Sequence, residues 1–271
     1  MKKPVEFSPR MNVIQFRVLF CRYMRQIITN PWTIIPLVLE APFMLVIVSF
    51  VYKDNCFIDF GKGGLSAANT TLFLLALAPA LMGLLNSYRE ICKEREILSR
   101  EVFGGLDVTA YVVSKVAVLA IVGAVQTFIL VFGSMIFIDY GFSRPSYSIF
   151  FFLVAIFLTN YAVTAMGLLV SALLKKSESA ILPVLIIIIM QVVFAGSLLE
   201  FEEPVKYLYF ITPAMYGNSV LGNVAGLNAF FTMREIFDYN VYASCVILLA
   251  IAFVCHVLTV IKLKRDYRTK D

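Results

Sequence analysis

The segment Tyr88–Gly105, YREICKEREILSREVFGG, is an island of charge in a chain that is 60% hydrophobic. Its four basic and four acidic side chains leave no net charge. At about 100° per residue, the spacing of a helix, they separate by sign into stripes. The acidic stripe consists of Glu90, Glu94 and Glu101. The segment therefore predicts a helix with sorted charges.

The same helix has a third, apolar face, formed by Tyr88, Ile91, Leu98 and Val102. Arg95 is the one charge on this face. We expect it to pair with an acidic side chain at the cytosolic ends of the membrane spans that are described below. The glycines at 104 and 105 predict where the helix stops. Repulsion along the acidic stripe favours a helix that docks on a partner, and a solvated surface helix remains the alternative.

The composition is that of an integral membrane protein. Of 271 residues only 15% are charged and 24 are Phe, and the mean hydropathy is +0.85. The net charge of +5 does not indicate nucleic-acid binding, because the basic residues flank apolar stretches instead of covering a soluble face. The five cysteines have neither metal-ligand spacing nor the pattern of a disulfide framework.

Residues 1–30 form the first expected unit. Ser8 and Pro9 predict a helix start. One face of this helix is apolar, comprising Val13, Phe16, Phe20, Tyr23, Met24 and Ile27. We expect an amphipathic helix in the membrane interface, with arginines toward lipid phosphates. An amphipathic helix packed on a soluble partner is the alternative.

Residues 31–271 form the second expected unit, with six apolar spans of about 17 to 27 residues, each long enough to cross a bilayer. The spans are Trp32–Val51, Thr70–Asn86, Val116–Ile138, Ser148–Leu174, Ala180–Leu199 and Tyr242–Ile261. The fold class is therefore an all-α polytopic membrane protein.

The basic residues predict the orientation of these spans. An even number of spans puts both termini on one side, and eighteen of the 23 Lys and Arg residues fall on that side. The remaining five are Lys53, Lys62, Arg144, Lys206 and Arg234. By the positive-inside rule, both termini and residues 88–105 are expected in the cytosol.

Residues 200–238, between the last two spans, are apolar and aromatic but interrupted by Pro213 and by glycines at 222 and 226. Such a stretch is too broken for a further span. It predicts a re-entrant or interfacial segment at the outer leaflet, buried in protein. An ordinary hydrophobic outer loop is the alternative.

Motifs for catalysis, metal binding and nucleotide binding are missing from the sequence. No phosphate-binding loop, HExxH or Gly-x-Ser-x-Gly occurs, and a single histidine, His256, excludes a multi-histidine metal site. No catalytic residue or metal ligand is therefore predicted. Within the spans, His256 is expected to donate a packing hydrogen bond, and Glu40 to face a partner helix or a wet cavity.

The run Glu94–Glu101, EREILSRE, followed by Gly105, Ala110-Tyr111 and Ser114-Lys115, resembles a motif in the membrane domains of ATP-binding-cassette exporters. The G subfamily and similar bacterial permeases carry it between their second and third spans. Leu98 stands where those proteins often have Phe. The resemblance extends over the whole chain, including the connecting helix, the six spans, the helix after the second span and the re-entrant segment. Phe194–Leu199 also resembles the end of the family's fifth span, where leucines close the exit.

The resemblance implies the permease subunit of an ATP-driven exporter in the plasma membrane. The cytosolic helix would be a coupling helix that docks on an ATPase and passes its movement to the spans. Because the chain begins almost at the connecting helix, we expect a separate ATPase polypeptide, as in prokaryotic systems. ATP and Mg would bind that partner, and two permease halves, identical or related, would face each other across a central path.

The resemblance also suggests which residues serve these roles. Those expected to couple to the ATPase are Glu90, Glu94, Arg95, Arg100 and Glu101. Those expected along the substrate path are Glu40, Asn86, Gln191, Leu198 and Leu199. The apolar path suits a hydrophobic or amphipathic substrate, whether lipid, peptide or drug. An ion-gradient-driven secondary transporter and a membrane-embedded enzyme are the alternatives.

Overall fold

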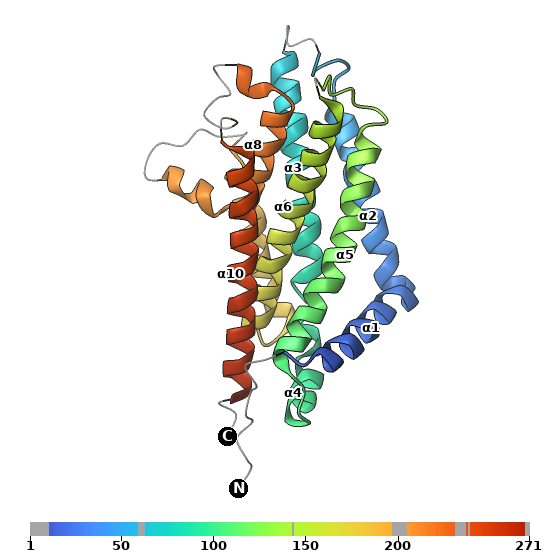
Figure 1. Ribbon diagram of the computed structural model, residues 1–271, viewed down its shortest axis with the longest axis vertical. Coiled ribbons are helices and arrows are strands. Elements are labelled where there is room, and N and C mark those ends of the chain that lie inside the picture. The colour runs from blue at the N-terminus through green and yellow to red at the C-terminus, as the bar shows by residue number, and fades with distance from the viewer. Residues whose placement is uncertain are drawn as a thin grey trace.

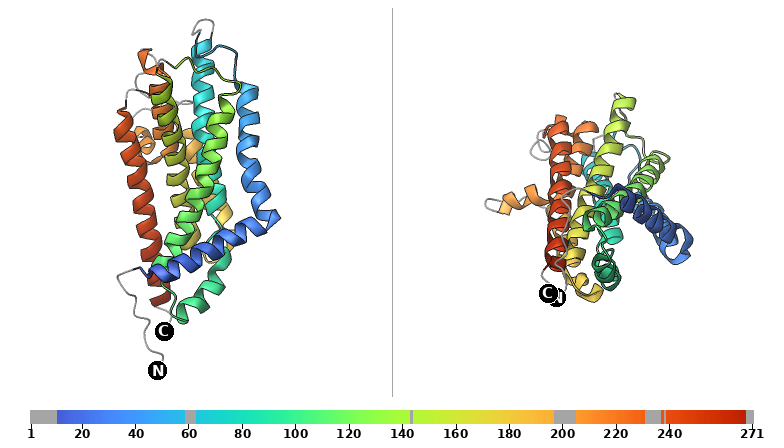
Figure 2. Two further views of the ribbon diagram at one scale, coloured as in Figure 1. Left: turned by 45° about the vertical axis from the view of Figure 1, so that its right-hand side comes forward. Right: turned by 60° about the horizontal axis from the view of Figure 1, so that its bottom comes forward.

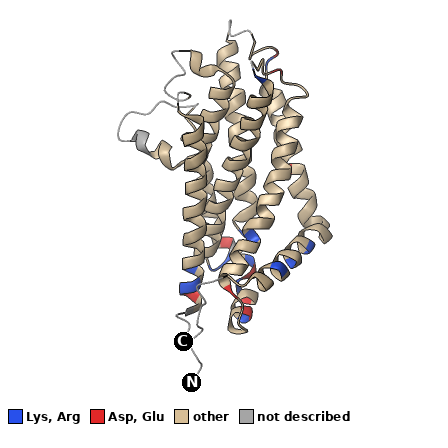
Figure 3. Cartoon of the chain, in the orientation of Figure 1, with Lys and Arg blue, Asp and Glu red and all other residues tan. Residues whose placement is uncertain are grey.

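The computed structural model describes residues 11–58, 63–142, 144–196, 205–230, 237 and 239–268. Throughout these ranges the regular elements are helices (Figure 1). Long helices run side by side, while α1 (Val13–Thr29) and α4 (Arg95–Phe103) lie at one end of the bundle. Most charged side chains gather at that end, which we call the charged end (Figure 3). The opposite end is called the far end.

Five helices are long and apolar enough to cross a membrane. They are α2 (Pro31–Val51), α3 (Gly64–Ser87), α5 (Val108–Ser134), α6 (Pro145–Leu173) and α10 (Val241–Arg268). At about 1.5 Å per residue, even the shortest reaches about 30 Å, the thickness of a bilayer's hydrocarbon core. Five of the six predicted spans thus correspond to helices of sufficient length.

The fifth predicted span, Ala180–Leu199, corresponds to a shorter helix. After η2 (Ser177–Ala180), α7 covers Ile181–Val193, 13 residues. A helix of that size is about 20 Å long and does not cross a bilayer alone. Leu198 and Leu199, predicted at the exit, lie outside the described residues. The count of six spans therefore stays a prediction.

Helix α1 crosses the charged end obliquely beneath the long helices (Figure 2). The Asn12 side chain caps its start, and Asn30 ends it while capping α2, whose first residue is Pro31. Its Leu19, Tyr23 and Ile27 are buried in one apolar cluster with residues of α4 and α5. Most of the predicted apolar face therefore packs on this chain itself, although Val13 is exposed.

The charged segment does not form one continuous helix, so that prediction is wrong. A turn follows α3, then the short η1 (Cys92–Glu94), and α4 begins only at Arg95. The Ser171 hydroxyl of α6 accepts the backbone N–H groups of Ile91 (2.9 Å) and Cys92 (3.0 Å). These bonds fix the turn against α6. The helix ends at Gly104 and Gly105 as predicted, with Gly105 at a φ of 94°.

Three of the four residues of the predicted apolar face are confirmed as buried together, whereas Tyr88 is half-buried and packs against a different cluster. Ile91, Leu98 and Val102 are each at most 1% exposed. They belong to the same cluster as the buried side chains of α1. Burial of this face orients the charged side chains of the segment.

At the far end, residues 205–230 form three helical elements. They are η3 (Val205–Ile211), α8 (Pro213–Val224) and η4 (Leu227–Ala229). Helix α8 is almost wholly buried and packs against α3, α6 and α10. The part of the segment 200–238 that the structure describes is thus helical and largely buried in protein, while residues 200–204, 231–236 and 238 are not described. A re-entrant or interfacial position at the outer leaflet stays a prediction.

Small residues bring α3, α5 and α6 together in the middle of the bundle. A Cβ added at Gly83 would lie 2.4 Å from the Asn160 carbonyl oxygen, and one at Gly123 would lie 2.4 Å from Asn160 Oδ1. Asn160 Nδ2 donates to the carbonyl of Pro79 (3.2 Å). Asn160 therefore packs between two glycines, a contact that fixes the relation of three spans.

Candidate functional site

The start of α1 is tied to the connection between α4 and α5. The Asp107 carboxylate caps α5 by accepting the N–H of Thr109 (2.8 Å) and also accepts the N–H of Asn12 (2.9 Å). The Gln15 side chain donates to the Gly105 carbonyl (3.2 Å) and accepts the N–H of Asp107 (2.7 Å). Because each side both donates and accepts, these hydrogen bonds hold the start of α1 in a fixed position against the α4–α5 connection.

A buried lysine of α5 neutralises two of the three acids predicted to form a stripe. Lys115, 2% exposed, lies with Nζ 2.8 Å from Glu94 Oε1 and 3.3 Å from Glu90 Oε2. The same ammonium group is 3.6 Å from the centre of the Tyr23 ring of α1. The repulsion that suggested an external partner is thus relieved within the chain.

Two tyrosines complete this charged cluster, which we define as Tyr23, Glu90, Glu94, Tyr111 and Lys115. Tyr23 donates its hydroxyl to Glu90, and Tyr111 donates to Glu94 Oε2 (2.9 Å). Burial, together with the adjacent Glu90 carboxylate, raises the pKa of Tyr23 well above its usual range. Tyr23 therefore stays protonated and remains a donor. The cluster joins α1, the α3–α4 connection and α5.

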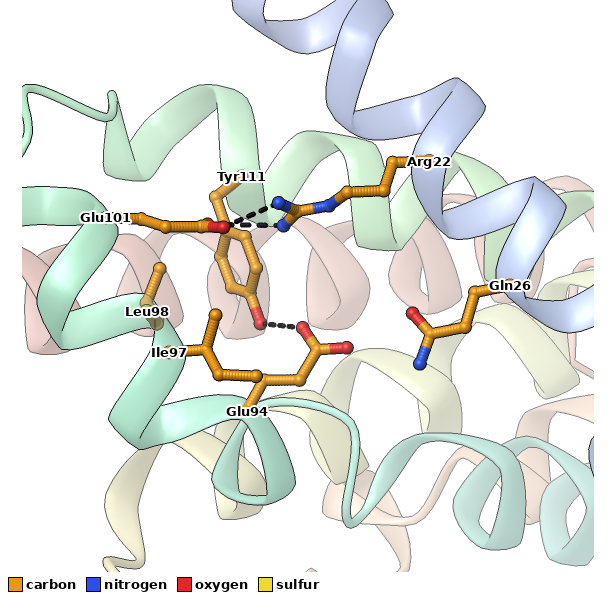
Figure 4. Close-up of a pocket in the computed structure, with 7 residues that line it drawn as sticks. All are labelled: Arg22, Gln26, Glu94, Ile97, Leu98, Glu101 and Tyr111. Atoms are coloured by element: carbon orange, nitrogen blue, oxygen red, sulfur yellow. Dashed lines mark hydrogen bonds and ion pairs between the residues drawn. The ribbon is translucent and has the colours of Figure 1, made fainter.

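The third acid of the stripe, Glu101, pairs with α1. Arg22 Nη1 lies 2.6 Å from Glu101 Oε1, and Nη2 lies 3.2 Å from Oε2, so the contact is bidentate. The side chains of α1, α4 and α5 border a pocket of about 250 Å³ here (Figure 4). Its lining is formed by Arg22, Gln26, Glu94, Ile97, Leu98, Glu101 and Tyr111.

Arg95, at the start of α4, connects to two further helices. It donates to the carbonyls of Ala172 (3.0 Å) and Leu174 (2.6 Å) at the end of α6, and it pairs with Asp266 of α10. The guanidinium thereby satisfies carbonyls that a helix end leaves without partners. Lys262 holds the other oxygen of Asp266 at 2.6 Å. The predicted pairing of Arg95 with an acid at this end of the spans is confirmed.

The exposed side of α4, which we call its outer face, does not carry the three acids of the predicted stripe. The exposed side chains of α4 are Glu96, Ile97, Arg100 and Phe103, of which Ile97 also borders the pocket beside α1. Ile97 is 56% exposed and Phe103 52%, although they neighbour buried Leu98 and Val102. Of the five residues predicted to couple to an ATPase, only Arg100 lies on this outer face; the other four contact the chain's own helices.

Two residues predicted along the substrate path, Glu40 and Asn86, are brought together through Gln126 of α5. Gln126 Nε2 donates to Glu40 Oε2 and to the Leu37 carbonyl, both at 2.9 Å. Asn86 Nδ2 donates to Gln126 Oε1 (3.0 Å). Glu40 therefore faces a partner helix, which was one of the two predicted environments.

Gln191 lies apart from that group. Its Oε1 accepts the backbone N–H of Ala214 (3.0 Å), one of the donors left without an intrahelical partner at the start of α8. The side chain is 1% exposed and links α7 to α8. It is thus placed at the far-end helix, away from Glu40 and Asn86.

The prediction for His256 is wrong. In the described part of the chain neither ring nitrogen has a hydrogen-bond partner, and the ring packs 5.3 Å from that of Tyr161. The described residues likewise contain no group of His, Cys, Asp and Glu that could hold a metal ion.

Sequence reasoning did not connect Tyr23, Asp266 or Gln126 to the partners that they have in the structure. Their partners are 67, 171 and 86 positions away in the chain. One signal was present for Gln126, because an amide in an apolar span needs a partner. No spacing rule connects Tyr23 or Asp266 to the charged segment.

The fold and this linked set of side chains define a helical membrane component with a charged connection after its second long helix. The profile of ABC-2 type transporters matches residues 14–224, and the chain belongs to that family. It is 28% identical, over 217 residues, to the ABC transporter ATP-binding/permease protein Rv1747 of Mycobacterium tuberculosis (strain ATCC 25618 / H37Rv). The match covers 75% of this chain and 24% of that protein, so the chain spans about a quarter of the relative's length.

Proposed function

We propose that this chain is the permease of an ATP-driven exporter and that α4 is its coupling helix. The observation that carries the proposal is the set of polar contacts that joins α4 and the residues just before it to four other helices. Glu101 contacts α1, Glu90 and Glu94 contact α5, and Arg95 contacts α6 and α10. A displacement of α4 would therefore act on several spans at once.

The outer face of α4, formed by Glu96, Ile97, Arg100 and Phe103, is the surface that we assign to the ATPase. Two half-exposed apolar side chains beside charged ones suit the centre of a protein interface better than a solvated helix. Glu90, Glu94 and Glu101 would act behind this surface by transmitting the movement to α1 and α5. This division revises the predicted docking stripe.

The ATPase is proposed to be an ATP-binding-cassette subunit on a separate chain, which would bind ATP and Mg. The sequence of this chain carries no phosphate-binding loop. The relative Rv1747 is named as an ATP-binding/permease protein, so the two activities occur together in that protein. In this system the permease would meet its ATPase through α4.

The substrate is proposed to be hydrophobic or amphipathic, such as a lipid, peptide or drug, moved outward across the plasma membrane. Two permease halves, identical or related, would form the path. Apolar side chains dominate the exposed faces of α2, α7 and α10, which is consistent with contact to lipid and to a second half. Both termini and α4 would lie in the cytosol.

Co-expression with an ATP-binding-cassette protein encoded beside the permease tests the proposal. We expect the two proteins to co-purify, ATP hydrolysis to appear in the complex, and the permease alone to hydrolyse none. Robust hydrolysis by the isolated permease, free of contaminating ATPase, would refute the assignment. So would a complex in which the two proteins never associate.

A cysteine-labelling experiment tests the orientation. An impermeant maleimide added outside intact cells should reach a cysteine at Arg144 and miss cysteines at Glu96 and Lys176. The exposed Cys21 should be replaced by serine first. Labelling of Glu96→Cys from outside would contradict the proposed topology.

A further inference from the structure

The contact between Arg95 and Asp266 joins α4 to the last long helix. Asp266 lies near the end of α10, and its side chain is 19% exposed, whereas that of Arg95 is 15% exposed. Arg95 uses Nη1 for the two α6 carbonyls and Nη2 for Asp266, so the guanidinium fills three contacts at once. A lysine at this position would not present the same fork.

A second contact strengthens the same junction. The Tyr267 hydroxyl donates to the backbone carbonyl of Arg95 (3.5 Å). Leu263, fully buried, and Tyr267, 3% exposed, share an apolar cluster with Leu98 and Val102 of α4. The end of α10 thus touches α4 through charge, a hydroxyl and apolar packing.

Helix α10 is continuous over 28 residues from this junction to the far end. There its fully buried Leu248 and Ala252 pack with Met215 and Tyr216 of α8. At about 1.5 Å per residue, the helix is about 42 Å long. Figure 1 shows α10 running from the charged end up to α8. One rigid element therefore contacts α4 at one end and α8 at the other.

We propose that Arg95 and Asp266 are positioning residues that transmit movement of α4 to α10, and through α10 to α8. The route differs from the charged cluster around Lys115, which leads from the same segment to α1 and α5. This inference rests on the proposed function, because the movement of α4 is attributed to the ATPase. It adds a second path by which the effect of ATP binding is transmitted to the far end.

Lys262 provides a matched control. It contacts the same carboxylate as Arg95 but lies four residues earlier on α10 itself. Loss of the Lys262 contact leaves the bridge between α4 and α10 intact. Transmission should therefore depend on Arg95 and Asp266 and be insensitive to Lys262.

The test uses the full permease–ATPase complex in lipid nanodiscs, with a reporter cysteine at Ala225, the residue that ends α8. The rate at which a maleimide labels Ala225→Cys is measured with and without Mg-ATP. We expect ATP to change this rate in the reference protein. In Asp266→Asn the ATP-dependent change should be at least about fivefold smaller, the lower range of typical coupling between sites. Asp266→Glu should restore most of it, and Lys262→Gln should leave it unchanged.

The outcomes separate this inference from the proposed function. Normal ATPase binding with an unchanged labelling response in Asp266→Asn would overturn the inference alone. An equal loss in Lys262→Gln would also overturn it, since that result indicates a general effect on the end of α10. If the unmodified permease binds no ATPase, the proposed function fails and the inference fails with it. If Asp266→Asn does not fold, Arg95→Lys replaces it and should reduce the response because the fork is lost.

Discussion

Lys115 Nζ lies 2.8 Å from Glu94 Oε1, in a place where the lysine is only 2% exposed. This pair connects the third long helix of the chain to the segment just before α4. Buried ions of this kind are expensive to separate, since removal of one partner leaves the other charge without compensation. The pair therefore fixes where α4 sits relative to α5.

Replacement of Lys115 by methionine should lower the free energy of unfolding by about 3–5 kcal/mol, the range for breaking a buried ion pair. The loss should be large because both Glu90 and Glu94 would be left without their shared cation. Reversible unfolding in mixed detergent micelles measures it. Lys93→Met is the control: Lys93 pairs with Glu90 from an exposed position, so its loss should cost at most about 1 kcal/mol. Equal losses for the two variants would contradict the assigned role of Lys115.

A second prediction concerns the polar contact between α2 and α5. Gln126→Leu should lower the free energy of unfolding by about 1–3 kcal/mol, because Glu40 loses one of its donors, and Asn86 its acceptor, within apolar spans. The double variant Gln126→Leu/Glu40→Leu should recover part of that loss, since the carboxylate is removed together with its donor, while Asn86 still lacks the oxygen that accepted from its amide. If Gln126→Leu still transports but the stable double variant does not, Glu40 belongs to the substrate path. Recovery of both stability and transport would identify a structural role.

The helical class and five long spans were predictable from the sequence. In a membrane a long apolar run must hydrogen-bond its own backbone, and a helix does so within one segment. The buried face of the charged segment was predictable as well, from the spacing of Ile91, Leu98 and Val102. These features depend on neighbours in the sequence. Periodicity is enough to find them.

What the acidic side chains Glu90, Glu94 and Glu101 face was not predictable from the sequence. An acid on a helix surface can face a partner protein or another helix of its own chain, and the difference lies in residues far away in sequence. Lys115, Tyr23 and Arg22 decide it here, and all of them belong to other helices. The break before α4 has the same origin, because it depends on the Ser171 hydroxyl of α6.

A third prediction addresses the close approach of α3 and α6. A Cβ at Gly167 would lie 2.0 Å from Ser87 Oγ and 3.2 Å from Ser87 Cβ, so Gly167→Ala should cost about 1–3 kcal/mol of stability. Ala124, a small residue of α5, is exposed by contrast. Ala124→Val, which adds volume to an open surface, should change stability by at most about 0.5 kcal/mol. Thermal unfolding in detergent measures both, and a silent Gly167→Ala would contradict the packing described.

The last prediction decides which face of α4 meets the ATPase. On the outer face, Ile97→Ser and Phe103→Ser remove half-exposed apolar side chains and should lower the stability of the permease by at most about 2 kcal/mol, the value for the apolar area that each buries. Each should weaken ATPase binding by about tenfold or more, which corresponds to about 1.4 kcal/mol. Ile136→Ser, at a still more open apolar position beyond α5 at the far end, should leave binding unchanged. Glu94→Lys should behave in the opposite way, since a second cation beside Lys115 disrupts the chain before any partner binds. Titration of the ATPase against each variant in nanodiscs, alongside thermal unfolding, distinguishes the two faces. If Glu94→Lys folds normally and alone loses the ATPase, the acidic stripe is the docking surface and the outer face is not.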